Sequence, residues 1–309
     1  MANAQIATPL APRTYPYAVL AVGLLTAATG MMCIRMALNS GVPSLVIVAT
    51  RMGIAVAVFT PFILRSHWHT IRQLRRRDFL LLALAGMFFA GDLTLFSEAI
   101  NHTSILLATV IGGLAPLWTA LLERVVLRSQ LHPKVYMGLT LALAGGVTIA
   151  IASSDNSAGL GENPLLGALM ALCSGASSAS YLIVARSLRP RIPLMPYIWL
   201  VFGFATLIAL VVALATGIPF TGYAPEGYLW ILAVTIISQL IAHPSFSFAV
   251  GYLSPTFISI SAHSITVLAS GMAFFLFQEI PGPGQMLGSA IILLGVLFAI
   301  VGQSEFKRR

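Results

Sequence analysis

Long apolar stretches alternate with short polar connections along the whole chain. Ten of these stretches have roughly the 20 residues that an α-helix needs to cross the hydrocarbon core of a bilayer. The predicted spans are 17–37, 43–64, 79–100, 103–123, 134–152, 164–186, 193–215, 226–247, 254–276 and 283–303. The connections between them are too short to hold a soluble domain. The pattern therefore predicts an all-α polytopic membrane protein with ten transmembrane helices.

The composition strengthens this prediction. Of the 309 residues, 58% are apolar and 8% are charged, and the mean hydropathy is +0.92. Soluble domains carry about 25% charged residues, so this chain is far too apolar for one. The net charge of +8 comes from basic residues in the short connections, which is a topology signal and not a nucleic-acid surface. We expect contact with the lipid bilayer and no nucleic-acid partner.

Basic residues gather on one side of the predicted membrane. Fifteen of the 17 lysines and arginines lie on the side of the two termini, and the other two, Arg35 and Arg51, lie inside predicted helices. Connections on the opposite side carry Asp155, Glu162 and Glu226 instead. By the positive-inside rule, we expect both termini in the cytoplasm and a multi-pass protein of the cell (inner) membrane.

The chain repeats itself at an offset of 150 residues, which aligns Gly138 with Gly288 and Gly145 with Gly295. Each half holds five predicted helices. Because five is an odd number, the second half must enter the membrane from the opposite side. We therefore expect two inverted repeats, which is the architecture of alternating-access carriers that bind substrate near the midplane.

These features divide the chain into five parts. We expect a cytoplasmic tail at 1–16, a first repeat at 17–152, an extracytoplasmic linker at 153–163, a second repeat at 164–303 and a basic cytoplasmic tail at 304–309. The aligned glycines stand seven residues apart in the fifth and tenth predicted helices. Such rows indicate close packing of these two helices, either within one protomer or across a homodimer.

Further short motifs match between the halves. The first helix of each half has a small residue seven positions before an arginine, at Ala28 and Arg35 and at Ala179 and Arg186. The fourth helix contains Pro116, and Glu279 precedes the glycine row of the tenth helix. With these motifs the chain resembles the drug/metabolite transporter superfamily, and within it the EamA-type permeases with ten helices. The resemblance implies a carrier that exports or takes up small metabolites such as amino acids, or expels drugs, through a cavity lined by the first four helices of each half.

Three ionisable side chains lie deep within predicted helices: Arg51, Asp92 and Glu98. A charge near the bilayer centre costs about 2.5–3.5 kcal/mol, so each of them should face a partner or a cavity. Arg51 and Asp92 both lie eight residues from the outer ends of their helices, about 12 Å deep, so an ion pair is feasible. Either this pair orders helices two and three, or Asp92 or Glu98 binds a substrate ammonium or a proton.

Polar residues interrupt the eighth and ninth helices around His243 and His263. Each histidine is either a packing residue or a ligand or proton carrier. The stretches around them are too polar to face lipid, so both histidines are candidates for the wall of a wet cavity. Further candidates lie in the fourth, sixth and eighth helices: Trp118, Ser178, Tyr181 and Gln239.

Motifs of pumps and enzymes do not occur in the sequence. The only lysines are Lys134 and Lys307, and neither follows a glycine-rich loop, which excludes a P-loop. The patterns His-Glu-x-x-His and Gly-x-Ser-x-Gly are both missing. Cys33 and Cys173 are isolated in apolar segments. We therefore expect no enzyme activity, no metal site and no cofactor.

The preferred interpretation is an alternating-access secondary transporter that exports small metabolites, most of all amino acids or related compounds. Efflux of drugs or organic cations and uptake of metabolites are the alternatives. A membrane-embedded enzyme or a channel is a more remote one. Protons are the candidate coupling ion, and Asp92, Glu98 or His263 would then carry them, whereas a facilitator would need none of the three.

Overall fold

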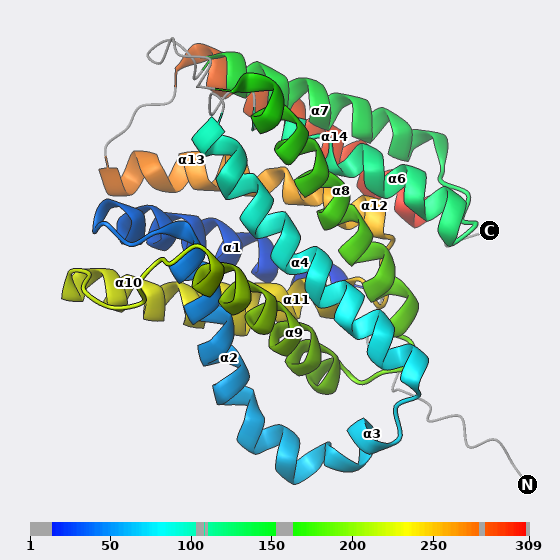
Figure 1. The fold of residues 1–309 in the computed structure, drawn as a ribbon. Coiled ribbons are helices and arrows are strands. Elements are labelled where there is room, and N and C mark those ends of the chain that lie inside the picture. Colours follow the sequence, from blue (N-terminus) through cyan, green and yellow to red (C-terminus); the bar gives the residue numbers. More distant parts are fainter. Residues whose placement is uncertain (1–13, 103–107, 109–110, 153–162, 278–281, 307–309) are drawn as a thin grey trace, which may run out of the picture.

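Helices make up most of the structure, a computed structural model that describes residues 14–102, 108, 111–152, 163–277 and 282–306 (Figure 1). Within these ranges no strand is present. Several sequence predictions lie outside the described residues. They are the first 13 residues of the N-terminal tail, the start of the fourth span, most of the linker at 153–163 and the last three residues.

The described helices follow the predicted spans closely. The first half holds α1 (Tyr15–Asn39), α2 (Ser44–Ser66), the short α3 (Trp68–Arg72), α4 (Arg76–His102), α6 (Ala115–Val126) and α7 (Pro133–Ala152). The second half holds α8 (Pro164–Leu188), α9 (Leu194–Ala215), α10 (Pro225–Val234), η1 (Thr235–Ala242), α11 (His243–Ala249), α12 (Pro255–Ala262), α13 (Ser264–Phe277) and α14 (Pro283–Phe306). Many of these helices begin at a proline, whose fixed φ and missing N–H suit the first turn.

Six of the described helical segments are long and apolar enough to cross a membrane, and shorter apolar helices lie at 133–149, 255–269 and 286–302. The protein is therefore a polytopic membrane protein, as the apolar pattern predicts. Two spans are less regular than expected. The eighth contains a π-helix, η1, directly before His243-Pro244, where the proline cannot donate a backbone hydrogen bond. The ninth is interrupted at His263, between α12 and α13.

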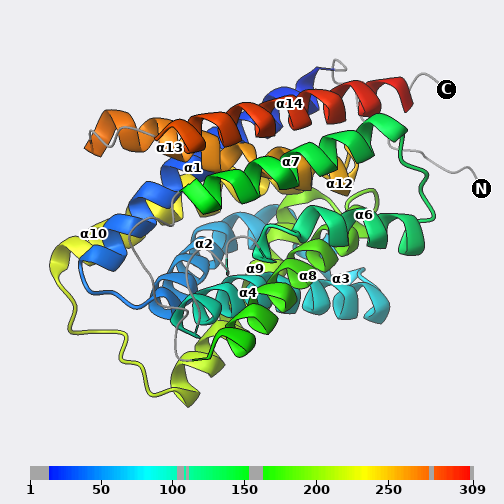
Figure 2. The same cartoon turned by 90° about the horizontal axis from the view of Figure 1, so that it is seen from above.

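The two halves pack against each other as a pair of equivalent units. α1 of the first half packs against α10, η1, α11 and α13 of the second half, and α8 of the second half packs against α4 and α6 of the first half. Two further pairs join equivalent helices across the halves, α2 with α9 and α7 with α14, and α6 of the fourth span packs against α12 of the ninth. Figures 1 and 2 show α7 and α14 side by side at one edge of the molecule. The contacts of α1 in the second half therefore correspond to the contacts of α8 in the first half, as expected for two related repeats.

Close packing of α7 on α14 depends on the glycine rows. A Cβ at Gly138 would lie 2.6 Å from the carbonyl oxygen of Gly295, and one at Gly145 would lie 2.6 Å from that of Gly288. As the residue number rises along α7, it falls along α14, so the two helices run antiparallel. This direction is the one that inverted repeats impose on their fifth helices. The glycine faces meet within one chain, which leaves only the other faces of α7 and α14 for contact between protomers.

We predict that Gly145→Ala destabilises the protein. The added methyl group would meet backbone atoms, the Gly288 oxygen at 2.6 Å and the Ile292 nitrogen at 2.8 Å, and neither can move alone. The expected cost of about 1–3 kcal/mol exceeds the gain of about 1 kcal/mol from alanine's helix propensity. The measurement is the thermal unfolding midpoint of the purified protein in detergent. Gly203→Ala, within α9 with no atom within 4 Å of the new methyl group, is the control and should not lower the midpoint.

Candidate functional site

A cavity of about 650 Å³ lies between two groups of helices. We call α1, α10, η1, α11, α12 and α13 the α1 bundle, and α4, α6 and α8 the α8 bundle. Both bundles line the cavity, and α7 and α14 contribute to one side. Its wall is largely apolar and includes Met31, Phe89, Phe96, Leu143, Ile258 and Ile292. A cavity of this size accepts a small organic molecule.

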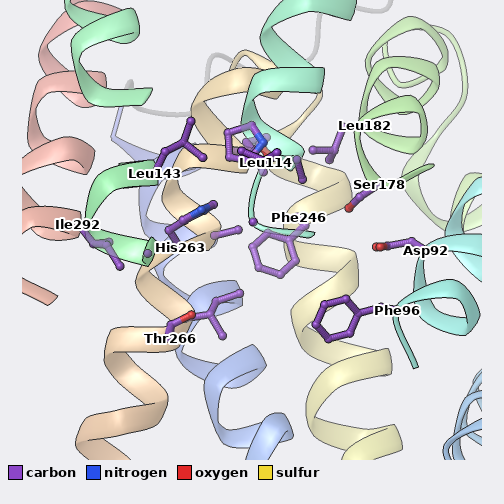
Figure 3. Close-up of a pocket in the computed structure, with 18 of the residues that line it drawn as sticks. Asp92, Phe96, Leu114, Leu143, Ser178, Leu182, Phe246, His263, Thr266 and Ile292 are labelled. Carbon is purple, nitrogen blue, oxygen red and sulfur yellow. The ribbon is translucent and has the colours of Figure 1, made fainter. Parts of the chain in front are cut away.

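Asp92 is the sole carboxylate among the described residues that line the cavity. It projects from α4, and the Ser174 hydroxyl of α8 lies 2.7 Å from its Oδ1 atom. The Ser178 hydroxyl also hydrogen bonds to this carboxylate. Figure 3 shows Asp92 and Ser178 on the same side of the cavity. Two serine hydroxyls thus hold the acidic group at the cavity wall, where it can accept hydrogen bonds from a bound cation.

The two candidate histidines both line the cavity but do not form a pair. His243 packs edge-on against Phe89, with ring centroids 4.8 Å apart. The His263 ring instead hydrogen bonds to the backbone of Ser259 and of Gly113, and Gly113 lies in the turn just before α6. Of the described residues, no three from the set of His, Cys, Asp and Glu come close enough to hold a metal ion.

Tyr181 and Ser178 also line the cavity, whereas four candidates do not. Glu98 is exposed and Trp118 is half-buried outside the wall. Arg51 and Gln239 are buried behind it, with 3% and 0% of their surfaces exposed.

The feasible ion pair between Arg51 and Asp92 does not form, since no ion pair within 4 Å joins these two described residues. Asp92 faces Ser174 and Ser178 on α8. The charge of Arg51 acts instead on the His243 ring, at the start of α11. Equal depth in the membrane does not bring two side chains together when their helices present them to different neighbours.

Comparison with known proteins identifies the family. The sequence profile of the EamA-like transporter family matches twice, at residues 14–151 and 165–301. This chain belongs to the EamA-like transporter family. The two matches fall on the two halves described above, so the family's repeat is the unit that packs as a pair here.

Relatives of this EamA transporter include several named carriers. An uncharacterized transporter, YwfM of Bacillus subtilis (strain 168), is 28% identical over 70% of this chain and 72% of its own length. A probable terminal-alkyne amino-acid exporter of Streptantibioticus cattleyicolor is 25% identical over 77% and 78%. A solved crystal structure superposes with a TM-score of 0.79 at 19% identity, over 96% of this chain and 99% of the other, and it supports the fold alone.

The cavity of the EamA transporter is closed at one face of the molecule. We call the face where α1 begins and α14 ends the terminal face. Near it, α12 packs against both α6 and α8 and so joins the two bundles. Farther along the ninth span, the packing of α13 within the described residues is on α1, α12 and α14, away from the α8 bundle. Within the described residues, α12 therefore joins the two bundles near the terminal face, and α13 makes no such connection.

Glu123 holds this closure together, and the sequence analysis did not single it out. Its side chain is 3% exposed near the end of α6, and its Oε2 accepts a hydrogen bond from the Thr256 backbone N–H at 2.9 Å. That N–H belongs to the first turn of α12, where the helix dipole favours a carboxylate. Arg186 of α8 adds a favourable charge interaction with Glu123, and its Nη1 donates to the Val250 carbonyl at 2.8 Å. The sequence does carry a signal for this contact: an acidic residue lies near the end of the fourth span, and Ser254-Pro255 marks the start of a helix.

We predict that Glu123→Gln loosens the terminal face. A neutral amide weakens the charge-assisted contact with α12 by about 1.4 kcal/mol, which corresponds to roughly a tenfold change in population. The reporter is Ser259→Cys on the cavity wall, with Cys33 and Cys173 replaced by alanine. A membrane-impermeant maleimide supplied at the terminal face should label it several-fold faster in the Glu123 variant. The exposed neighbour Arg124 supplies the control, Arg124→Gln, and equal labelling of all variants would contradict the assignment.

Proposed function

We propose that this EamA-family transporter exports small zwitterionic metabolites, amino acids first, across the cell (inner) membrane by alternating access. The observation that carries the proposal is the cavity lined by helices of both inverted halves, with Asp92 at its wall. Inverted repeats around a central site are the usual basis of alternating access. Asp92 matches a substrate ammonium group, and the apolar wall matches a hydrocarbon side chain.

The orientation follows from the charge pattern. The basic connections, and the ends of α1 and α14 that lead to the basic tails, lie at the terminal face, which by the positive-inside rule is cytoplasmic. In this orientation Glu123 and α12 join the two bundles on the cytoplasmic side of the cavity. In an alternating-access exporter, contacts of this kind on the cytoplasmic side would have to open before the next substrate binds.

Two observations support amino acids within the metabolites. A relative at 25% identity bears the name of a probable terminal-alkyne amino-acid exporter. The described lining residues include no lysine or arginine, so the cavity wall offers no cluster of cations for phosphorylated substrates. A second candidate is efflux of organic cations, which the same features favour because one carboxylate in an apolar cavity also suits a lone positive charge.

We predict that Asp92→Asn impairs transport without impairing folding. Asparagine keeps an acceptor for the Ser174 hydroxyl but loses the charge that attracts an ammonium group. Catalytic efficiency should fall roughly tenfold or more, the size of a lost charge-assisted hydrogen bond. The assay is counterflow of radiolabelled leucine, and of a panel of other amino acids, into proteoliposomes. The control is Glu226→Gln, which changes an exposed acidic residue in the first turn of α10. This variant should transport normally.

The same proteoliposomes test proton coupling and the rival substrate class. An imposed pH gradient should drive uphill amino-acid movement in the wild type and not in Asp92→Asn if the carboxyl group exchanges its proton for substrate. Saturable flux of quaternary ammonium compounds, together with no saturable flux of any amino acid, would replace the proposed function with organic-cation efflux.

A further inference from the structure

Arg51 is a buried cation whose Nε atom has no partner among the described residues. It lies on α2, its side chain is 3% exposed, and its Nε has no hydrogen-bond acceptor. Among the described residues, none forms a hydrogen bond or an ion pair with its guanidinium group. A buried charge is costly unless it is paired. A guanidinium group offers a planar set of five N–H donors, which matches a carboxylate in a two-point contact.

Gln239 is a second buried polar side chain without partners. It is fully buried in η1, and both its amide oxygen and its amide nitrogen have no hydrogen-bond partner. The surrounding π-helix is a form that recurs at functional sites because it redirects side chains. Ser238, its neighbour, fits tightly against Gly30 of α1, so the backbone at this point is fixed by packing. A primary amide in this position can donate to an anion and accept from a cation.

These two side chains converge on the cavity at His243. The η1 segment packs against α2, which carries Arg51. His243 follows Gln239 by four residues, so the two lie on one side of the helix. The charge of Arg51 acts on the His243 ring, and that ring is part of the cavity wall. The unpartnered side chains of Arg51 and Gln239 therefore lie on elements that pack next to His243.

Asp92, the acidic residue of the cavity wall, lies across the cavity from Arg51, Gln239 and His243. Phe89 and Asp92 are three residues apart on α4 and both line the cavity. The Phe89 ring packs against His243, with ring centroids 4.8 Å apart. An ammonium group at Asp92 thus has the Arg51, Gln239 and His243 group on the facing side of the cavity. In Figure 3, Asp92 and Phe96 stand at the α4 side of the cavity, with Phe246, from the helix that carries His243, facing them.

We propose that Arg51, Gln239 and His243 form a carboxylate subsite, which binds the carboxylate of a zwitterionic substrate while Asp92 binds its ammonium group. The proposal rests on the proposed function for the identity of the substrate. In the conformation described here, Arg51 and Gln239 do not line the cavity, so the carboxylate reaches them when the His243 ring turns away from Phe89. The subsite selects amino acids over simple amines, which lack the group that it binds.

The test compares substrates that differ only in the carboxylate. Leucine, leucinamide and 3-methylbutylamine share the amine and the side chain, and only leucine carries a carboxylate. In proteoliposomes, Arg51→Gln should raise the KM for leucine roughly tenfold or more and leave the KM for 3-methylbutylamine unchanged. Arg51→Lys keeps the charge and loses the two-point contact, so its KM for leucine should be intermediate. Arg65→Gln, at an exposed arginine on the other end of α2, is the control.

Gln239→Leu separates binding from packing. Leucine has a similar volume and removes two unpartnered buried atoms, so a purely structural role predicts an unchanged or higher thermal unfolding midpoint with unchanged transport. The proposal instead predicts an unchanged or higher midpoint together with a several-fold rise in the KM for leucine. Equal losses of leucine and 3-methylbutylamine transport in both the Arg51→Gln and the Gln239→Leu variants would overturn it.

A binding measurement keeps this test independent of the proposed function. 4-Methylpentanoate is leucine without its amine, and it should raise the unfolding midpoint of the detergent-purified wild type by a few degrees but not that of Arg51→Gln. If the wild type moves no amino acid and this shift still appears, the proposed function fails and the carboxylate subsite stands. If 4-methylpentanoate shifts neither protein, the carboxylate subsite is rejected whatever the transport assay shows.

Discussion

A bilayer offers no hydrogen-bonding partner to the polar groups of a chain that crosses it. The structure meets this constraint first in its backbone, because the crossing segments are helices that satisfy their own N–H and C=O groups. Even where Pro244 removes a donor, the preceding segment stays coiled as the π-helix η1. The constraint acts again on the side chains. Asp92, His243 and His263 all face the cavity, because the lipid side offers them nothing to bind.

The inverted repeats place these polar side chains around one central cavity. Because each half has an odd number of spans, α7 and α14 run antiparallel and pack through their glycines at one edge. The α1 and α8 bundles then face each other with the polar groups between them. At the terminal face they are joined by a few contacts, among them the hydrogen bond from Thr256 to Glu123. A closure of this size is worth a few kcal/mol, and the proposed alternating access requires a closure that is no stronger than this.

Segment positions were predictable from the sequence, whereas the rotation of each helix was not. The predicted span 193–215 is observed as Leu194–Ala215, and 164–186 as Pro164–Leu188, since length and apolarity alone define a span. Lipid and protein core are equally apolar, so the hydrophobic pattern carries little information about which face of a helix points inward. For this reason Trp118 was expected at the cavity and lies outside it, and Arg51 was matched to Asp92 by depth alone.

Polarity within a segment was the better guide to the site. Asp92, Ser178, Tyr181, His243 and His263 were all chosen as groups too polar for lipid, and all line the cavity. The same reasoning passed over Glu123, because this residue is the last one of the predicted span 103–123 and does not lie deep within it. Its partner, the first turn of α12, lies in the other half of the chain and 133 residues away. Contacts of that range depend on how the halves dock, which no local pattern encodes.

Arg51 and Gln239 have buried atoms without hydrogen-bond partners. For a carrier this is more useful than a core in which every buried polar group is paired. An acidic residue beside Arg51 would remove the cost of its burial, but that residue would compete with any anionic substrate group. Without such a partner, the empty protein bears part of a penalty that can reach about 3–5 kcal/mol for a buried charge. A ligand that supplies the missing carboxylate relieves this penalty, and it does so most fully in a conformation that excludes water from the site. Substrate binding would thereby favour the closed state, and this differential affinity is what a carrier needs to couple binding to movement.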